Sequence, residues 1–290
     1  MGLSHGSRLP APCSRLPAHV SRLTSHVSRL TPVNVYLAAM TSPDSVMRYA
    51  RPAPELRAAP GMSLRIATFN LFFAKRIDRA IAVARAEPNL AAADVLALQE
   101  ADETAAHRIA EALGLGFVYY PALRHPRTGR NFGPALLARW PVEADRRLDL
   151  PHTGLSSMPR IAIGAGLRIG SELVTVYVVH FGTMREMLPL HQNAQARMVL
   201  RDAAGRPGPA VVAGDLNRKG IGRLFEAEGW HWVTRDVGRT HLVWSFDHVF
   251  LRGFDRTTVQ AGSVHAALAA SDHRAVWARI DRAADSRAAT

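Results

Sequence analysis

The segment Ala210-Val211-Val212-Ala213-Gly214-Asp215-Leu216-Asn217 places an acid and an amide directly after an apolar run. Two prolines before it and a glycine near its end predict a short, buried and central β-strand. Asp215 and Asn217 are two residues apart, so their side chains point to the same side if the extended conformation continues. A carboxylate that orients water and an amide that donates to a phosphoryl oxygen would then share one cleft. Gly, Asp and Asn are also common turn formers, so a plain turn is the alternative.

The composition indicates a folded protein with an anionic partner. The chain has 290 residues, of which 48% are hydrophobic, and this is enough for a sizeable core. The sequence has no uninterrupted apolar run long enough for a transmembrane segment. Its single cysteine, Cys13, excludes an internal disulfide. The net charge of +12 favours nucleic acid, a phospholipid headgroup or a phosphorylated metabolite as partner, without choosing among them.

The first 61 residues have a different character from the rest of the chain. Residues 7–34 repeat every seven residues, but prolines interrupt the pattern and predict disorder rather than a helix. An organellar transit peptide and translated upstream DNA with a native start at Met62 are the alternatives, and we favour the second. We therefore expect a disordered leader over 1–61, one domain over 62–281 and a polar tail over 282–290.

The rest of the sequence alternates apolar and polar residues in short segments. We expect strands over 64–70, 94–100, 117–120, 135–138, 161–167, 173–180, 210–215, 244–251 and 276–280. Helices are expected over 77–84, 103–113, 190–203 and 224–228. Strands outnumber helices and do not alternate strictly with them. This pattern predicts a mixed-sheet α/β sandwich in one domain, rather than a barrel or a doubly wound parallel sheet.

Polar residues stand where the apolar runs stop. They are Asn70, Glu100, His180, Asp215 with Asn217, and Asp247, and the segment Ser271-Asp272-His273 precedes the last strand. One such residue is ordinary, because buried polar groups can be satisfied locally. Six sites of types that bind hard metal ions or transfer protons are harder to explain as turns.

These motifs resemble those of the endonuclease/exonuclease/phosphatase superfamily. The matching segments, in order, are Phe69-Asn70, Leu98-Gln99-Glu100, Gly214-Asp215-Leu216-Asn217, Phe246-Asp247-His248-Val249 and Ser271-Asp272-His273. The segment Gly133–Pro141 is similar to the family's Ser-Arg-x-Pro strand, with Ala138 in place of the serine. The resemblance covers about Leu64 to Ile280. It implies an α/β (α+β), DNase I-like four-layer sandwich of two packed mixed β-sheets flanked by helices, with its active site at one edge of the two sheets.

The resemblance implies a phosphoester hydrolase that uses one Mg²⁺, with Mn²⁺ as the alternative ion. Mg²⁺ prefers oxygen ligands, and Glu100 is the expected ligand, supported by Asn70 and by Asp272. His273 is the candidate base or transition-state donor, and Asp247 would accept its ring N–H and fix the tautomer. Asp215 would orient the attacking water.

The remaining expected contacts are with the substrate. Asn217 would hold the scissile phosphate and His180 would donate to it from the other side. Each of these residues also has a simpler interpretation. Asn70 and Asp272 could be local caps, and His180 could be a core histidine, although the family match favours catalysis.

Three further residues are given structural interpretations, and one turn is a weak candidate for the site. His248 would face away from Asp247, Arg160 would be a solvated surface arginine, and His191 would be structural. The polar turn Gly129-Arg130-Asn131 is considered only as a weak candidate for the cleft lining.

The substrate class stays open between a phosphodiester in nucleic acid, a phospholipid headgroup and a soluble or inositol phosphate monoester. The rival class of function is a non-catalytic basic binding module of the same fold, and a second rival is DNA binding through the arginine-containing leader. We expect a cytoplasmic monomer, with secretion as the alternative location.

Overall fold

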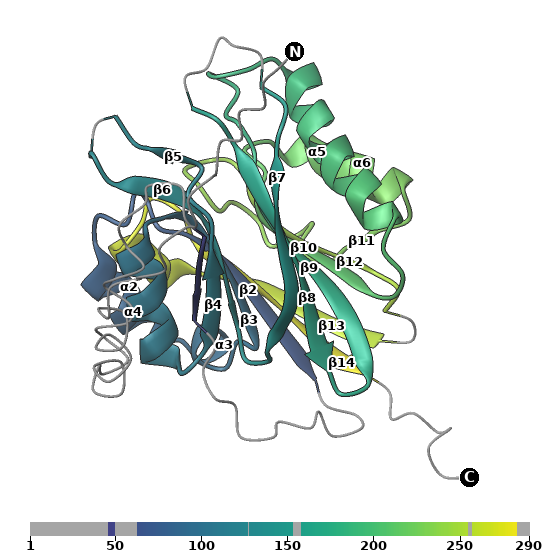
Figure 1. The fold of residues 1–290 in the computed structure, drawn as a ribbon, viewed down its shortest axis with the longest axis horizontal. Helices are drawn as coiled ribbons and strands as arrows, with labels where there is room; N and C mark the ends of the chain where they lie inside the picture. Colours follow the sequence, from purple (N-terminus) through teal and green to yellow (C-terminus); the bar gives the residue numbers. More distant parts are fainter. Residues whose placement is uncertain (1–45, 50–62, 127, 153–157, 255–256, 283–290) are drawn as a thin grey trace, which may run out of the picture. The chain divides into compact units, whose positions relative to one another are not determined.

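The computed structural model describes residues 46–49, 63–126, 128–152, 158–254 and 257–282. Within them, two mixed β-sheets pack against each other, and helices lie on the outer sides (Figure 1). The predicted sandwich of two sheets is therefore confirmed. None of the helices in these ranges is long and apolar enough to cross a membrane.

The first sheet has the order β1-β4-β6-β3-β2-β14-β13, with β5 paired to β6. Its strands are β1 (Met47–Tyr49), β2 (Leu64–Asn70), β3 (Val95–Ala101), β4 (Gly116–Tyr119), β5 (Leu123–Arg124), β6 (Asn131–Ala138), β13 (Thr257–Val264) and β14 (Ala275–Arg282). Strands β2 and β3 are parallel, and β14 is antiparallel to β2. This pairing places the ends of β2 and β3 at one edge of the sheet.

The second sheet has the order β11-β12-β10-β9-β8-β7. Its strands are β7 (Val142–Asp149), β8 (Ile161–Ile169), β9 (Glu172–His180), β10 (Ala210–Asp215), β11 (His231–Trp232) and β12 (Asp247–Arg252). As predicted, β10 is central, and all six of its residues are buried. The turn at Gly170 and Ser171 joins β8 and β9 as an antiparallel hairpin, which the sequence also predicts.

The helices are α2 (Ile77–Ala86), α3 (Pro88–Ala91), α4 (Glu103–Leu113), α5 (Pro189–Ala204) and α6 (Gly222–Ala227), with 3₁₀ turns at Lys219–Ile221 and His265–Ala269. Helices α2 and α4 lie beside the first sheet and α5 and α6 beside the second (Figure 1). Helix α4 follows its prediction closely. Asp102 caps its first turn by accepting from the Ala105 N–H at 2.7 Å, and Gly114 ends it at φ 68°.

The buried apolar residues form two clusters, because the side chains of each strand of the second sheet point alternately to its two faces. In β10, Val211 and Ala213 face the first sheet, whereas Ala210 and Val212 pack among residues of α5 and α6. The side chains of one strand point alternately to opposite faces. Asp215 therefore points toward the space between the sheets, as Val211 and Ala213 do.

One prediction about the chain's boundaries needs correction. Residues 47–49 belong to the predicted leader, yet they form β1 and pair antiparallel with β4. Arg48 also forms an ion pair with Asp145 at 2.7 Å. The leader therefore contributes a strand to the first sheet. The rest of residues 1–61, with the heptapeptide repeat, and most of the predicted tail lie outside the described residues.

The strand predicted over 244–251 is wrong at its start. The β-strand begins at Asp247, and Trp244 lies in a tight turn with its side chain 52% exposed. The strands β7 and β13 are not predicted at all. They are the last strands of their sheets, where fewer apolar residues are needed for burial.

Candidate active site

The predicted site residues of the second sheet meet because three strands end in register. Asp215 is the pairing partner of His180 in β9 and of Asp247 in β12. All three occupy positions whose side chains face the first sheet, because they continue the alternation of buried residues in their strands. His248 has the opposite orientation, as predicted. It is buried beside Trp232 at a ring-centroid distance of 4.8 Å.

Gly214 makes the close approach of β10 and β9 possible. Its φ is 153°, and a Cβ atom there would lie 2.0 Å from the carbonyl oxygen of Val179. No side chain fits in that space, so only glycine allows this pairing. The glycine before Asp215 therefore sets the distance between Asp215 and His180, whose Nε2 is 3.7 Å from the Asp215 Oδ2.

Glu100 reaches the site through an irregularity in β3. The pairing of β3 with β6 shifts register between Leu98 and Ala101, and Glu100 itself has φ 56°. A left-handed non-glycine residue is uncommon and marks a strained position. Its side chain is 14% exposed, and its Oε2 accepts a hydrogen bond from the Phe73 N–H at 2.9 Å. The bulge therefore fixes one carboxylate oxygen in place.

Asn70 links the two sheets. Its amide nitrogen donates to the Asp215 Oδ2 at 3.0 Å and lies 3.4 Å from the Glu100 Oε1. Its own oxygen accepts from the Phe72 N–H at 3.0 Å. Asn70 thus holds both carboxylates through hydrogen bonds, and one of them is Glu100, which is predicted to bind the metal ion.

Burial shifts the protonation of the two carboxylates. It raises the pKa of Glu100 to about 7, against the attraction of Arg160 and His273. It also raises the pKa of Asp215 to about 6, against the opposing positive charge of His273. Two acids held close together in a dry site favour a bound cation or proton.

His273 is held by Asp247. The His273 Nδ1 lies 2.8 Å from the Asp247 Oδ2, and its Nε2 lies 3.8 Å from the Asp215 Oδ2. Burial lowers the pKa of His273, but the carboxylates of Asp247 and Asp215 outweigh it and raise the pKa to about 10. His273 is therefore an imidazolium at neutral pH.

The segment before His273 is tied to the first sheet. The Ser271 hydroxyl donates to the Asn70 carbonyl oxygen at 2.6 Å and accepts from the His273 N–H at 3.0 Å. The sequence motif predicts no role for this serine. Its hydrogen bonds place His273 relative to the end of β2.

His180 has a neighbour that the sequence interpretation placed elsewhere. The prediction that Arg160 is a solvated surface residue is wrong. It is 5% exposed, its Nη1 lies 3.1 Å from the His180 ring nitrogens, and it forms an ion pair with Glu186 at 2.8 Å. Burial, helped by the charges of Arg160 and His273, lowers the pKa of His180 well below its usual value. His180 is therefore neutral.

Asn217 sits in the predicted turn as well as in the site. Its φ is 53°, so the extended conformation ends before it, and its N–H donates to the Asp215 Oδ1 at 2.7 Å. Its side-chain amide donates to the Phe181 carbonyl oxygen at 2.9 Å. The chain therefore turns at Asn217, as the alternative interpretation has it, and the prediction that Asp215 and Asn217 point to the same side of one extended strand is wrong.

Asp272 lies at the outer side of the site. Its side chain is 38% exposed, and its Oδ2 is 3.5 Å from the Nε2 of His241. The His241 ring stands 4.5 Å from the ring of His273. His241 was not predicted as a site residue, and no local pattern marks it, because a turn in the loop before β12 brings it there. His241, Asp272 and His273 could together hold a metal ion, as could Asp215, Asp247 and His273.

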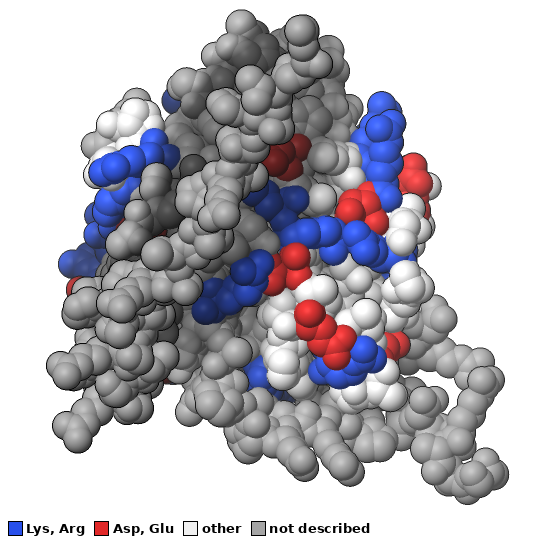
Figure 2. Space-filling view, in the orientation of Figure 1, with Lys and Arg blue, Asp and Glu red and all other residues white. Residues whose placement is uncertain are grey.

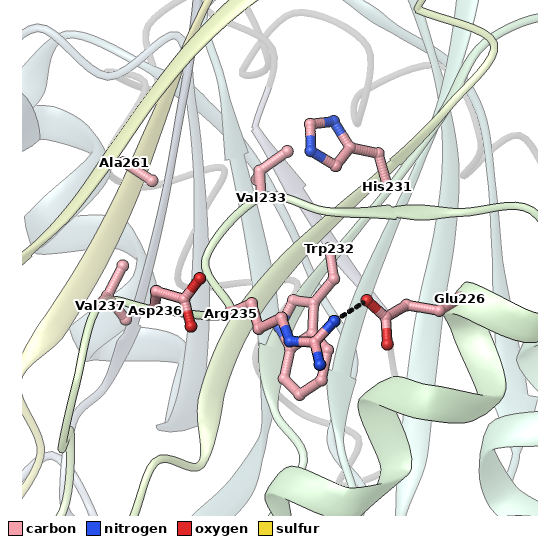
Figure 3. A pocket seen from close by; sticks show the side chains of 8 residues that line it. All are labelled: Glu226, His231, Trp232, Val233, Arg235, Asp236, Val237 and Ala261. Carbon is pink, nitrogen blue, oxygen red and sulfur yellow. Dashed lines mark hydrogen bonds and ion pairs between the residues drawn. The ribbon is translucent and has the colours of Figure 1, made fainter.

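Two other features lie outside this cluster. Arg130 forms an ion pair with Asp102 at 2.6 Å and donates to the Phe73 carbonyl oxygen, so it supports the loop that holds Glu100. A hollow of about 450 Å³ lies elsewhere, and Figure 3 shows Glu226 and Arg235 paired across it beside Trp232. Its lining includes none of the predicted site residues, and the Arg235 Nη1 donates to the Glu226 Oε1 at 2.7 Å.

The comparisons with known proteins identify the family of this chain. The model of the Endonuclease/Exonuclease/phosphatase family matches residues 67–273. The chain therefore belongs to the endonuclease/exonuclease/phosphatase family, and the predicted resemblance is confirmed. Members of this family are usually hydrolases that act on phosphoesters. Comparison of the sequence with curated proteins gave no match.

Solved structures share the fold. An endonuclease/exonuclease/phosphatase from Beutenbergia cavernae is 21% identical with a TM-score of 0.60, over 76% of this chain and 72% of that chain. One from Bacteroides vulgatus is 15% identical with a TM-score of 0.62, over 76% and 99%. TDP2 from Caenorhabditis elegans is 19% identical with a TM-score of 0.57, over 76% and 74%. At these identities the likeness shows a common fold.

Proposed function

We propose that the protein is a divalent-cation-dependent phosphodiesterase whose active site is the cluster around Asp215. The observation that carries this proposal is the convergence of three carboxylates and two histidines with different protonation states. His273 is charged and His180 is neutral, although both lie within 4 Å of the same Asp215 oxygen. Such opposed pKa shifts in one cluster are typical of acid and base chemistry.

The donor atoms fit a hard cation such as Mg²⁺. Glu100 and Asp215 are ionised only against the cost of burial, and a divalent ion would offset that cost. Oxygen ligands in small number, completed by water and by the substrate phosphate, suit Mg²⁺. Glu100 would hold the ion, Asn70 would orient that carboxylate, and Asp272 would contribute from the outer side. When bound, the ion would neutralise charge that develops on the phosphoryl oxygens.

Asp215 of the second sheet and His273, which precedes β14 of the first sheet, would act on the attacking water and the phosphoryl group. Asp215, with its pKa near 6, is ionised at pH 7 and accepts the proton of an attacking water. His273, held charged by Asp247, donates a hydrogen bond to the phosphoryl group in the transition state. This supports the donor role for His273 rather than the alternative of general base. Both residues would act mainly by electrostatic stabilisation, as expected for a phosphoryl transition state.

His180 and Asn217 would bind the scissile phosphate. The Arg160 Nη1 lies 3.1 Å from both ring nitrogens of neutral His180, so it donates to the unprotonated one in either tautomer, and the protonated nitrogen would donate to the phosphate. Asn217 uses one amide hydrogen on Phe181, and the second is left to donate to the phosphate. Arg160 adds a positive charge next to this position and is a positioning residue.

The surface charge gives limited information about the substrate. Figure 2 shows basic and acidic side chains next to one another on the described part of the face that carries β7 and β8. They form ion pairs such as Arg168 with Glu143 at 2.8 Å. The positive net charge is therefore not gathered into one patch on the described surface of this face.

The test is hydrolysis of a soluble phosphodiester, bis(4-nitrophenyl) phosphate, by the full chain with Mg²⁺ and with excess chelator. Glu100→Gln keeps the size of the side chain and removes its charge. We expect turnover by the wild type that the chelator abolishes and that Glu100→Gln largely loses. Turnover of 4-nitrophenyl phosphate without turnover of bis(4-nitrophenyl) phosphate would indicate a phosphomonoesterase instead. Binding of phosphate esters without turnover would support the binding module instead.

A further inference from the structure

Large apolar side chains that are exposed to solvent gather next to the candidate active site. Among the described residues, seven such side chains are exposed, and six of them lie in two segments. We call these six the apolar rim: Met184, Leu188, Leu190, Leu242, Val243 and Trp244, with exposed fractions of 48 to 74%. Soluble proteins rarely expose apolar groups in clusters, and clusters of this kind mark interaction surfaces.

Both segments begin or end at the catalytic strands. The first follows His180 at the end of β9, and the second precedes Asp247 at the start of β12. Strands β9 and β12 flank β10 on its two sides, with His180, Asp215 and Asp247 in register. The apolar rim therefore emerges from the same edge of the second sheet as the site.

The turn in the second segment has an unfavourable backbone conformation and exposes apolar side chains. His241 and Trp244 close a turn with hydrogen bonds of 2.7 and 3.0 Å, and Leu242 and Val243 occupy its two central positions. Leu242 has φ 48°, a position that glycine or asparagine adopts with less strain, and its side chain is 73% exposed. Neither backbone conformation nor core packing explains a leucine here. Strained residues of this kind collect at functional sites.

The aromatic member of the rim is attached to the site. The Trp244 ring is parallel to the Phe246 ring within 4° at 6.3 Å, and Phe246 stacks on His241 at 5.6 Å. His241 in turn lies against His273. Tryptophan is favoured at the boundary between water and lipid, because it has a large apolar surface and a polar N–H.

The charges around the rim suit an anionic surface. Arg185 adjoins Met184, and Arg239 precedes the turn, and both are exposed. The ion pairs of the described residues include neither of them, whereas the one acid of the first segment, Glu186, is bound by Arg160. Basic residues beside exposed apolar groups are attracted to anionic lipid.

We propose that the apolar rim docks on the surface of a bilayer that contains anionic phospholipid, and that the phosphoester substrate is a lipid headgroup at that surface. The second part rests on the proposed function, whereas the first does not. The side chains favour lipid over single-stranded nucleic acid. Bases stack on aromatic planes, and five of the six rim residues have no such plane.

The experiment is co-sedimentation of the full chain with vesicles of phosphatidylcholine and phosphatidylserine in equal amounts, in the presence of a chelator so that no hydrolysis occurs. The test variants are Leu242→Asn with Val243→Ser in one chain, and Leu188→Ser with Leu190→Ser in another. Asparagine suits the left-handed position, and serine at residue 188 suits the helix N-cap. The control is Leu173→Ser, which changes an equally large exposed leucine at the far end of β9.

We expect the wild type and Leu173→Ser to bind the vesicles, and each double variant to bind at least about tenfold more weakly. Added salt should weaken the binding, because it screens the arginines. The proposal is overturned if the wild type does not bind the vesicles, or if both double variants bind as the wild type does. It is also overturned if the wild type binds only a single-stranded oligonucleotide and the double variants lose that binding.

A separate assay on bis(4-nitrophenyl) phosphate with Mg²⁺ distinguishes this proposal from the proposed function. Retained hydrolysis by the double variants shows that their site is intact and assigns a vesicle-binding defect to the rim. Hydrolysis by the wild type without vesicle binding supports the proposed phosphodiesterase and contradicts membrane docking. Vesicle binding without any hydrolysis supports the apolar rim as a membrane-binding surface and contradicts the proposed phosphodiesterase.

Discussion

The Nδ1 atom of His273 lies 2.8 Å from the Oδ2 atom of Asp247, inside the space between the two sheets. The second oxygen of Asp247 is buried and has no hydrogen-bond partner among the described residues. The charge of Asp247 is thus directed at one partner, and it is the largest attraction that keeps the buried His273 protonated.

This pair predicts the pH dependence of turnover. The acid limb should reflect ionisation of Asp215 and Glu100, with pKa values of about 6 and about 7 that a bound cation would lower further. The alkaline limb should reflect His273, whose pKa is about 10. In Asp247→Asn the alkaline limb should move to lower pH, because burial then lowers the pKa of His273 without the opposing charge. The measurement is kcat/KM against pH, and an unmoved alkaline limb in Asp247→Asn contradicts the pairing.

Mg²⁺ should stabilise the protein more at high than at low pH. The folded-state pKa of Glu100 is about 7, above its ordinary value of 4.5, so the free protein loses stability as the pH rises through this window. The ion replaces the proton and removes that penalty. We expect a larger increase in Tm on addition of Mg²⁺ at about pH 8 than at about pH 5.5. Glu100→Gln is the control, and an equal increase in that variant shows that the ion binds elsewhere.

Loss of Arg160 should destabilise the fold. Arg160→Ala leaves Glu186 without its partner and opens a space beside His180, so the free energy of unfolding should fall by about 2–4 kcal/mol. Arg168→Ala removes an arginine that is 44% exposed and paired with an exposed Glu143, and it should cost at most about 1 kcal/mol. Urea unfolding of both variants gives the comparison. Equal costs imply that Arg160 is solvated, as the sequence interpretation had it.

Gly214→Ala should disrupt the site. The added Cβ would meet the Val179 carbonyl oxygen, a backbone atom that cannot move without separating β9 and β10. Gly238 is also at positive φ, but a Cβ atom there has nothing within 4 Å. Gly238→Ala should therefore cost about 1 kcal/mol from backbone strain alone, and Gly214→Ala several times more with loss of turnover. Comparable Tm values for the two variants contradict this role of Gly214.

The central strands could be predicted because consecutive apolar residues in the local sequence indicate that they are buried. In β10 the apolar residues run without interruption to Gly214 and Asp215, and in β9 the residues 176–179 lead to His180. These two polar residues are paired at the candidate site. The strand β7 was missed because Arg146 and Arg147 lie within it and form ion pairs with Asp202 and Asp149. Charged residues are tolerated on an edge strand, and in β7 they interrupt the alternation of apolar and polar residues that would indicate a strand.

The errors elsewhere have a common physical origin in long-range contacts. Arg160 is buried because residues 20 and 26 positions away surround it, and nothing near it in the sequence indicates this. The apolar run before Asp247 has the composition of a strand but forms a turn whose leucine and valine face solvent. His241 reaches the site only through that turn.

The most direct measurement of the central claim is the kcat of His273→Ala on bis(4-nitrophenyl) phosphate with saturating Mg²⁺, compared with the wild type. Circular dichroism of both proteins shows whether the variant is folded. The proposed role of His273 predicts that kcat falls by about 10²–10⁴-fold in a folded protein. A folded His273→Ala protein with the kcat of the wild type would contradict the account, because the phosphodiesterase would then not use the site around Asp215.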